Sequence, residues 1–174
     1  MNIIIKYYKS PFGELIIGSY GEFLCLSDWK YRKMRDSIDN RIKMGLKSDY
    51  IWGTSDIIEN AINELEKYFQ KKLGEFNVPL LFIGTEFQKK VWKALQNIKY
   101  GEISTYSELS KSIGMESAVR AVANANGANA LSIFVPCHRI IGKNNELVGY
   151  AGGLDTKNKL LNLEKSQKEK NLLF

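Results

Sequence analysis

The feature that most constrains the fold is a change of sequence pattern along the chain. The first 27 residues form short β-branched and aromatic runs separated by turn signals at 10–13 and 20–22, which predicts a small antiparallel sheet. Farther along, apolar residues recur at three- and four-residue steps, as in amphipathic helices. We therefore expect an α+β protein, with an N-terminal α/β structural domain over 1–80 and a mainly helical domain over 81–174.

The middle of the chain is less regular. Residues 30–50 are dense in charge with weak periodicity, which predicts a surface loop or a frayed helix. An amphipathic helix is predicted over 56–73, because apolar residues recur there at three- and four-residue steps and Thr54 and Ser55 can cap its start. The stretch 76–84 contains a proline and a short apolar run, and it is interpreted as the linker between the two domains.

The C-terminal half predicts three successive helices. Thr85 can cap the first, and the spacing of Thr105 and Glu108 fits a capping box at the start of the second. A third helix is expected from about Ser117 to Asn126. Two short helices joined by a glycine-containing turn are typical of a helix-turn-helix, although any two packed short helices can resemble one.

The third predicted helix carries little side-chain bulk. Ala118, Ala121, Ala123 and Ala125 dominate it, and Arg120 is its one long side chain. Close packing against another helix would explain this composition. The alternative is a slim helix that fits a nucleic-acid groove, and the narrow minor groove would require such slimness more than the major groove.

Positive charge is concentrated in the same half. Of the net charge of +6, residues 85–174 carry 13 Lys and Arg against 8 Asp and Glu, whereas 1–84 carry 12 against 11. A basic half suits a polyanion such as DNA, because each neutralised phosphate releases counterions. Solubility alone would also explain the excess.

The cysteine and histidine content argues against a structural metal or disulfides. The chain has two cysteines, Cys25 and Cys137, and one histidine, His138, so neither a disulfide framework nor a Cys/His zinc site is expected. It also lacks a secretory signal and a membrane-spanning apolar run. We expect a cytoplasmic protein with no metal, no cofactor and no membrane partner.

Cys137 is the candidate nucleophile. It follows a short apolar stretch over 131–135 and precedes His138 and Arg139, and nearby positive charge favours the reactive thiolate. Glu164 could orient the imidazole so that its other nitrogen accepts the thiol proton. A buried, inert cysteine and a solvated Glu164 are the competing interpretations.

The small-residue segment 148–153 is either a simple turn or the wall of a pocket in which Tyr150 stacks on a flat ligand. From the residues alone, two other functions compete with nucleophilic transfer. One is a non-catalytic helix-turn-helix regulator or damage sensor, and the other is a Cys/His hydrolase that turns over repeatedly.

Five segments, in order and spacing, resemble the O6-alkylguanine-DNA alkyltransferases over roughly residues 85–165. They are 100–109, 120–122, 135–141, 149–153 and 157–164. The resemblance implies direct DNA repair, in which the alkyl group of O6-alkylguanine, or of O4-alkylthymine, moves irreversibly to Cys137. Each molecule then reacts once.

The resemblance also implies roles for the neighbours of Cys137. His138 would take the thiol proton through a bridging water, and Glu164 would orient His138. Asn129 matches the asparagine that holds the segment leading to the cysteine. Tyr106 matches the tyrosine that contacts the flipped nucleotide and helps protonate the leaving guanine.

The implied partner is double-stranded DNA with an alkylated base, bound through its minor groove by a monomer, with the damaged nucleotide flipped out. Arg120 matches the arginine that fills the vacated stack. Further DNA contacts are expected from Tyr106, Ser117, Ala121 and Asn126. The expected substrate pocket consists of Val135, Ile140, Tyr150, Ala151 and Gly152.

Two positions depart from the family pattern. Ala151 stands where some members have serine, which removes a hydroxyl but leaves the backbone N–H. Ala130 stands where proline often follows the asparagine. Relatives that bind damaged DNA without repairing it carry tryptophan at the cysteine position, so Cys137 disfavours a pure sensor.

Overall fold

The computed structural model describes the backbone of residues 1–172 and the side chains of residues 1–165. The chain divides into two compact units, Met1–Gly84 and Thr85–Phe174. The Lys-rich tail at 165–170, to which the sequence assigned no role, lies almost wholly outside the described side chains.

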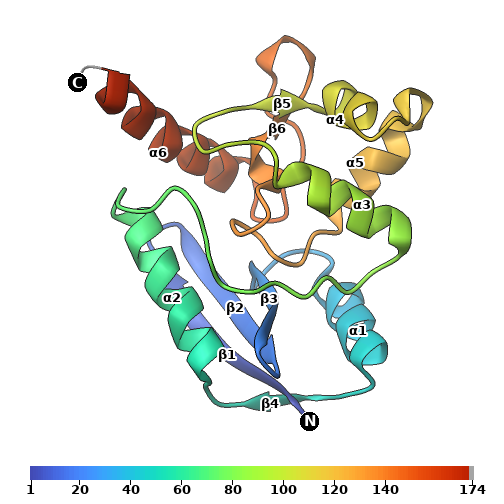
Figure 1. Ribbon diagram of the computed structural model, residues 1–174, viewed down its shortest axis with the longest axis vertical. Helices are drawn as coiled ribbons and strands as arrows, with labels where there is room; N and C mark the ends of the chain where they lie inside the picture. The colour runs from blue at the N-terminus through green and yellow to red at the C-terminus, as the bar shows by residue number, and fades with distance from the viewer. Residues whose placement is uncertain (173–174) are drawn as a thin grey trace. The chain divides into compact units, whose positions relative to one another are not determined.

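The N-terminal unit is built on a four-stranded sheet in the order β3-β2-β1-β4 (Figure 1). Strands β1 (Ile3–Ser10), β2 (Gly13–Tyr20) and β3 (Phe23–Trp29) form the predicted antiparallel meander. The short strand β4 (Tyr50–Trp52) was not predicted, and it pairs with β1 in parallel. The sheet is therefore mixed, because a distant three-residue segment completes its edge.

Residues 30–50 contain a regular helix where a loop or frayed helix was expected. Helix α1 spans Arg35–Leu46 and buries Ile38 and Ile42, which lie one turn apart. Arg35 pairs with the buried Asp28 at 3.0 Å and with Asp39 on its own helix at 2.9 Å. One ion pair with a strand residue and one within the helix thus stabilise a helix whose own periodicity is weak.

Helix α2 (Asp56–Phe69) covers one face of this sheet. The side chain of Ser55 accepts a hydrogen bond from the backbone N–H of Ile58, which confirms the predicted cap. The helix ends before residue 73, the predicted end, because Lys71 adopts a left-handed conformation with φ 62°. The expected linker, 76–84, also joins the sheet edge through hydrogen bonds between its backbone and Leu24.

The C-terminal unit contains the predicted helices. Helix α3 (Glu86–Leu95) begins with a capping box at Thr85, and α4 (Tyr106–Ser112) begins with one at Thr105, as expected from the sequence. A turn and a 3₁₀ segment (Glu116–Ala118) lead into α5 (Val119–Gly127), which packs against both α3 and α4. The ribbon shows the three short helices gathered together (Figure 1).

Two further elements position the chemistry of this unit. The two-residue strands β5 (Ser104–Thr105) and β6 (Ile140–Ile141) pair in parallel and join the start of α4 to the segment after Cys137. The long helix α6 (Leu154–Leu172) packs against the turn that holds Cys137. Within the described part of the chain, every helix is too short or too polar to cross a membrane.

Candidate active site

The residues before Cys137 form a tight buried turn instead of the strand or extended segment expected over 131–135. The backbone N–H of Val135 donates to the Leu131 carbonyl at 2.8 Å. At the turn, Ile133 is 1% exposed and has φ 76°, a left-handed conformation that β-branched residues rarely adopt. Such strain costs about 1–3 kcal/mol and persists only where the surrounding packing holds it.

Cys137 follows this turn directly. Pro136 has φ −80° and ψ 59°, and the Cys137 N–H donates to the Val135 carbonyl at 2.8 Å, which is an inverse γ-turn. A 3₁₀ turn, Cys137–Arg139, then carries the thiol and its two neighbours. Three consecutive turns therefore fix the backbone around the thiol.

Asn129 connects the turn to the sulfur. Its side-chain N–H₂ donates to the Val135 carbonyl at 3.0 Å and to Cys137 Sγ at 3.2 Å, while its carbonyl oxygen accepts from the Leu131 N–H at 2.9 Å. Asn129 is 2% exposed. A donor aimed at sulfur favours the thiolate, because a hydrogen bond to the charged form stabilises it.

His138 and Glu164 meet in the interior, a pairing that the family resemblance implied and that the residues alone left open. His138 Nε2 lies 2.7 Å from Glu164 Oε1, and both side chains are buried. Burial lowers the pKa of His138, although the carboxylate of Glu164 opposes that change. Nε2 therefore carries the proton and donates to the carboxylate, and Nδ1, which has no hydrogen-bond partner among the described residues, keeps its lone pair.

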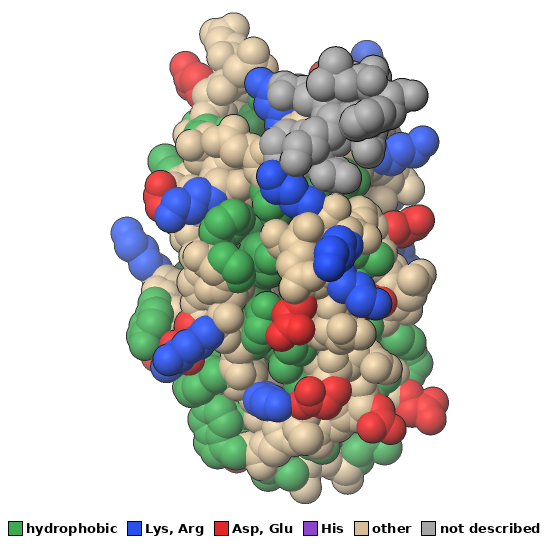
Figure 2. Space-filling view, turned by 90° about the vertical axis from the view of Figure 1, so that its left-hand side faces the viewer, with side chains coloured by type: hydrophobic (Ala, Val, Ile, Leu, Met, Phe, Trp, Pro, Cys, Tyr) green, Lys and Arg blue, Asp and Glu red, His purple; other side chains and the backbone are tan. Residues whose placement is uncertain are grey.

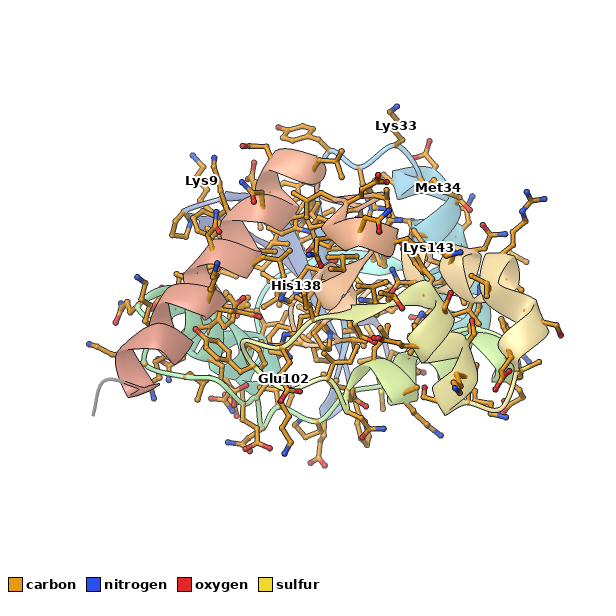
Figure 3. All side chains as sticks on the ribbon, turned by 90° about the horizontal axis from the view of Figure 1, so that it is seen from above. Lys9, Lys33, Met34, Glu102, His138 and Lys143 are labelled. Carbon is orange, nitrogen blue, oxygen red and sulfur yellow. The ribbon has the colours of Figure 1, made fainter. Side chains whose placement is uncertain are left out.

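The interior position of His138 is visible among the surrounding side chains in Figure 3. It is the only histidine of the chain, and no histidine surface is seen on the face drawn in Figure 2. A fully buried neutral imidazole beside a thiol is arranged to accept a proton rather than to titrate with the solvent.

Arg139 has a different role from the one its place in the sequence suggested. Its guanidinium forms two hydrogen bonds of 2.9 Å with the carboxylate of Glu164 and a third, of 2.6 Å, with the Ile98 carbonyl. Burial acts to raise the pKa of Glu164, but His138 and Arg139 outweigh it and hold that pKa well below its usual range. Arg139 thus keeps the partner of His138 ionised.

Tyr106 lies at the first position of α4, half-buried. Burial raises the pKa of its hydroxyl, the charge of Cys137 adds to this, and a hydrogen bond with the Asn126 side chain acts in the opposite direction. Asn126, predicted to touch DNA, is only 5% exposed and packs inside the unit. A Cβ on Gly149 would lie 3.7 Å from the Tyr106 hydroxyl, which places segment 148–153 beside this tyrosine.

The predicted pocket residues occupy two kinds of position. Val135 and Ile140 are fully buried. Tyr150, Ala151 and Gly152 are half-buried, and the ring of Tyr150 packs edge-on to that of His138 with centroids 6.4 Å apart. The part of this set that solvent can reach therefore lies in the 148–153 segment, beside the imidazole of His138.

The surface residues predicted to touch DNA lie around the start of α5. Ser117, Arg120 and Ala121 are exposed, whereas Ala125 is buried, and its carbonyl accepts a hydrogen bond from Trp92 Nε1 at 2.8 Å. The alanine-rich helix therefore packs one side against α3, as the first interpretation expected, and leaves its other side exposed.

Cys25 differs sharply from Cys137. It lies in β3, where burial raises the pKa of its thiol to about 12, so it stays protonated and unreactive at neutral pH. The two cysteines, both within the described chain, are not joined in a disulfide. The described residues also contain no group of three or more His, Cys, Asp or Glu side chains placed to hold a metal ion.

Comparison with known proteins identifies both units. Residues 3–82 match the ribonuclease-like domain of 6-O-methylguanine DNA methyltransferase, and residues 86–166 match its DNA-binding domain. A methylated-DNA–protein-cysteine methyltransferase of Methanosarcina barkeri is 41% identical over 153 residues, which cover 88% of this chain and 96% of the relative.

Solved structures agree with this match. The crystal structure of Mycobacterium tuberculosis OGT in complex with DNA matches this structure with a TM-score of 0.82 at 37% sequence identity. The match covers 94% of this chain and 94% of that chain. The O6-methylguanine-DNA methyltransferase of Pyrococcus kodakaraensis has a TM-score of 0.72 at 25% identity, with 93% of this chain and 98% of that chain covered. The chain therefore belongs to the 6-O-methylguanine DNA methyltransferase family.

Proposed function

We propose that this protein repairs DNA directly by moving the alkyl group of O6-alkylguanine to the sulfur of its own Cys137. The observation that carries the proposal is a buried set of two hydrogen-bonded pairs, Asn129 with Cys137 at 3.2 Å and His138 with Glu164 at 2.7 Å, in which Cys137 and His138 are consecutive residues. It supplies a nucleophile, a donor to sulfur, a proton acceptor and an orienting carboxylate. Family membership supplies the substrate class.

The reaction exchanges one bond for another. The thiol proton passes to Nδ1 of His138 through one water, and the thiolate pair attacks the alkyl carbon. A carbon–sulfur bond forms as the bond between that carbon and O6 breaks, and guanine leaves with the electron pair and takes up a proton. Tyr106 is the proposed proton donor to guanine, because its half-buried hydroxyl has a raised pKa and therefore carries its proton at neutral pH.

A thioether is a stable product, and the mechanism contains no step that restores the thiol. Each molecule is therefore consumed by one lesion. O4-alkylthymine presents the same alkyl–oxygen bond and is proposed as a second substrate.

We propose that the helix-turn-helix, α4 to α5, binds the minor groove of double-stranded DNA. Exposed Ser117 and Ala121 would approach the sugar-phosphate backbone of the DNA. Exposed Arg120 would fill the gap that the flipped nucleotide leaves in the base stack. Flipping is required because a side chain cannot reach O6 in a stacked duplex for in-line attack. The flipped base would lie between Tyr106 and the 148–153 segment.

One copy of the chain holds every proposed reacting group, so we propose that it acts as a monomer. We place the activity in the cytoplasm, since a reactive thiol remains available only where the surroundings are reducing.

The test is an intact-mass measurement after incubation with duplex DNA that carries one O6-methylguanine. We expect the protein to gain one methyl group on Cys137 and to plateau at one group per molecule with the DNA in excess. Cys137→Ala should gain none, and Cys25→Ala should behave as the wild type. An unchanged mass, or repeated turnover without modification of the protein, would refute the proposal.

A further inference from the structure

Lys157 is a buried cation in the C-terminal unit that the proposed reaction does not use. It lies in the first turn of α6 and its side chain is fully buried. Its Nζ donates to the Val148 carbonyl at 2.9 Å, to the Gly149 carbonyl at 3.2 Å and to the Ile140 carbonyl. All three N–H donors of an ammonium thus have a partner, whereas a neutral amine has only two N–H donors to offer.

The three carbonyls belong to two segments, one that follows Cys137 and one proposed to hold the base, and the proposed reaction needs these segments at a fixed distance from each other. Ile140 begins β6, one residue after the turn that carries Cys137. Val148 and Gly149 start the segment that includes Tyr150, which packs against His138. A single side chain therefore links the strand behind the nucleophile to the segment proposed to hold the base.

The charge of Lys157 is coupled to the reacting groups. Burial lowers its pKa to about 8, and the charge of Cys137 acts to raise it. Conversely, Lys157 acts to lower the pKa of His138. The other charged or titratable groups around this pair are Tyr106 from α4, Glu164 from α6 and Arg139 from the same turn.

Building on the proposed alkyl transfer, we propose that Lys157 is a positioning residue with two effects. It holds the segment at Val148 and Gly149 at a fixed place relative to Cys137, and its positive charge favours the thiolate over the thiol. The same charge favours the neutral form of His138, which is the form that accepts the proton.

The test measures the pH dependence of Cys137 alkylation by iodoacetamide, in a Cys25→Ala background that leaves a single thiol. With Lys157→Gln we expect the apparent pKa of Cys137 to rise by about one, which means about tenfold less thiolate at pH values below that pKa. Lys157→Arg keeps the charge and should restore the profile. An unshifted profile in Lys157→Gln would overturn the charge effect, even if that variant melts at a lower temperature.

Lys159→Gln is the matched control. Lys159 lies on the same helix and is about half exposed, 3.0 Å from Asp155, so the same substitution removes the same charge from the surface. Its profile should match the wild type. A shift as large as that of Lys157→Gln would mean that net charge alone is responsible, and it would overturn the inference.

A second measurement needs no variant and therefore does not depend on Lys157→Gln folding. The Cε resonance of Lys157 is titrated by NMR before and after Cys137 is alkylated with iodoacetamide. The thioether cannot carry negative charge, so we expect the pKa of Lys157 to fall after alkylation. Identical titrations would overturn the inference. Both assays use iodoacetamide, so they remain informative if the wild type accepts no methyl group from DNA and the proposed function fails.

Discussion

Nε2 of His138 and Oε1 of Glu164 lie 2.7 Å apart, although 26 positions separate the two residues in the chain. The same carboxylate receives two hydrogen bonds from Arg139, the residue that follows His138. One carboxylate on α6 therefore orients two consecutive side chains of the turn that carries Cys137.

Glu164→Gln should slow alkyl transfer while the fold is kept. The neutral amide supports a protonated imidazole less well and cannot accept both hydrogen bonds from Arg139. We expect a rate about 10- to 100-fold lower, at or below the lower end of the roughly 100- to 10,000-fold that a positioned proton acceptor contributes, because Glu164 acts through His138. Single-turnover kinetics with alkylated duplex DNA would measure it. Asp155→Asn, on the exposed side of the same helix, is the control, and a wild-type rate in Glu164→Gln would remove this residue from the mechanism.

Arg120→Ala should impair repair of duplex DNA more than reaction with a free alkylated base. A free base needs no flipping, so the residue proposed to fill the stack matters only in the duplex. We expect about a tenfold or greater loss on the duplex, because unstacking a base costs a few kcal/mol, and a nearly unchanged rate with free O6-alkylguanine. Lys93→Ala, which removes an exposed cation from α3, is the control. Equal losses of Arg120→Ala on both substrates would refute the role.

At position 133, a glycine variant should be more stable than an alanine variant, which is the reverse of the usual order. In ordinary backbone conformations glycine is less stable than alanine by about 0.5–1 kcal/mol, but at φ 76° it avoids the steric cost that any Cβ incurs. Both Ile133→Ala and Ile133→Gly lose the buried side chain, so their difference reports the backbone. We expect Ile133→Gly to be the more stable of the two by about 1 kcal/mol in chemical denaturation. The reverse order would show that the turn is not strained.

The free energy of unfolding should decrease as the pH falls below about 6.5. Burial lowers the pKa of His138, and the ion pairs hold that of Glu164 far below its usual range. The unfolded chain therefore takes up protons at His138 below about 6.5, and at Glu164 below about 4.3, before the folded protein does. The stability that these groups provide is complete above that window and is lost on acidification.

Melting temperatures of the wild type and Glu164→Gln across pH 7 to 4 would check this. The variant should lose less stability than the wild type below about pH 4.5, because the contribution of Glu164 is already absent. Parallel curves would show that Glu164 titrates alike in the folded and unfolded states.

Several parts of this protein followed from local sequence. The turn signals of the first 27 residues predicted β1 to β3, and Ser55, Thr85 and Thr105 marked the starts of three helices, since a cap bonds the backbone only three residues away. The short run from Pro136 to Arg139 also marked Cys137 as a candidate nucleophile with His138 as its neighbour, because both lie within one turn.

Other features depended on pairing between separate elements. The ion pair of Arg35 with Asp28 on β3, seven positions earlier, helps to hold α1, and β4 exists because β1, which is distant in the chain, offers it an edge. Pairing of this kind is not visible in the periodicity of either element.

The sequence by itself determined which groups are present: one thiol with one imidazole beside it, and a carboxylate and a lysine on a later helix. Only the tertiary structure decided their states. Burial and the pairing with Arg139 make Glu164 a fixed anion, and that anion sets which nitrogen of His138 keeps its lone pair. The same packing raises the pKa of Cys25 and aims the amide of Asn129 at Cys137. Ionisation depends on the dielectric and the charges around a group in space, and residue order does not specify either.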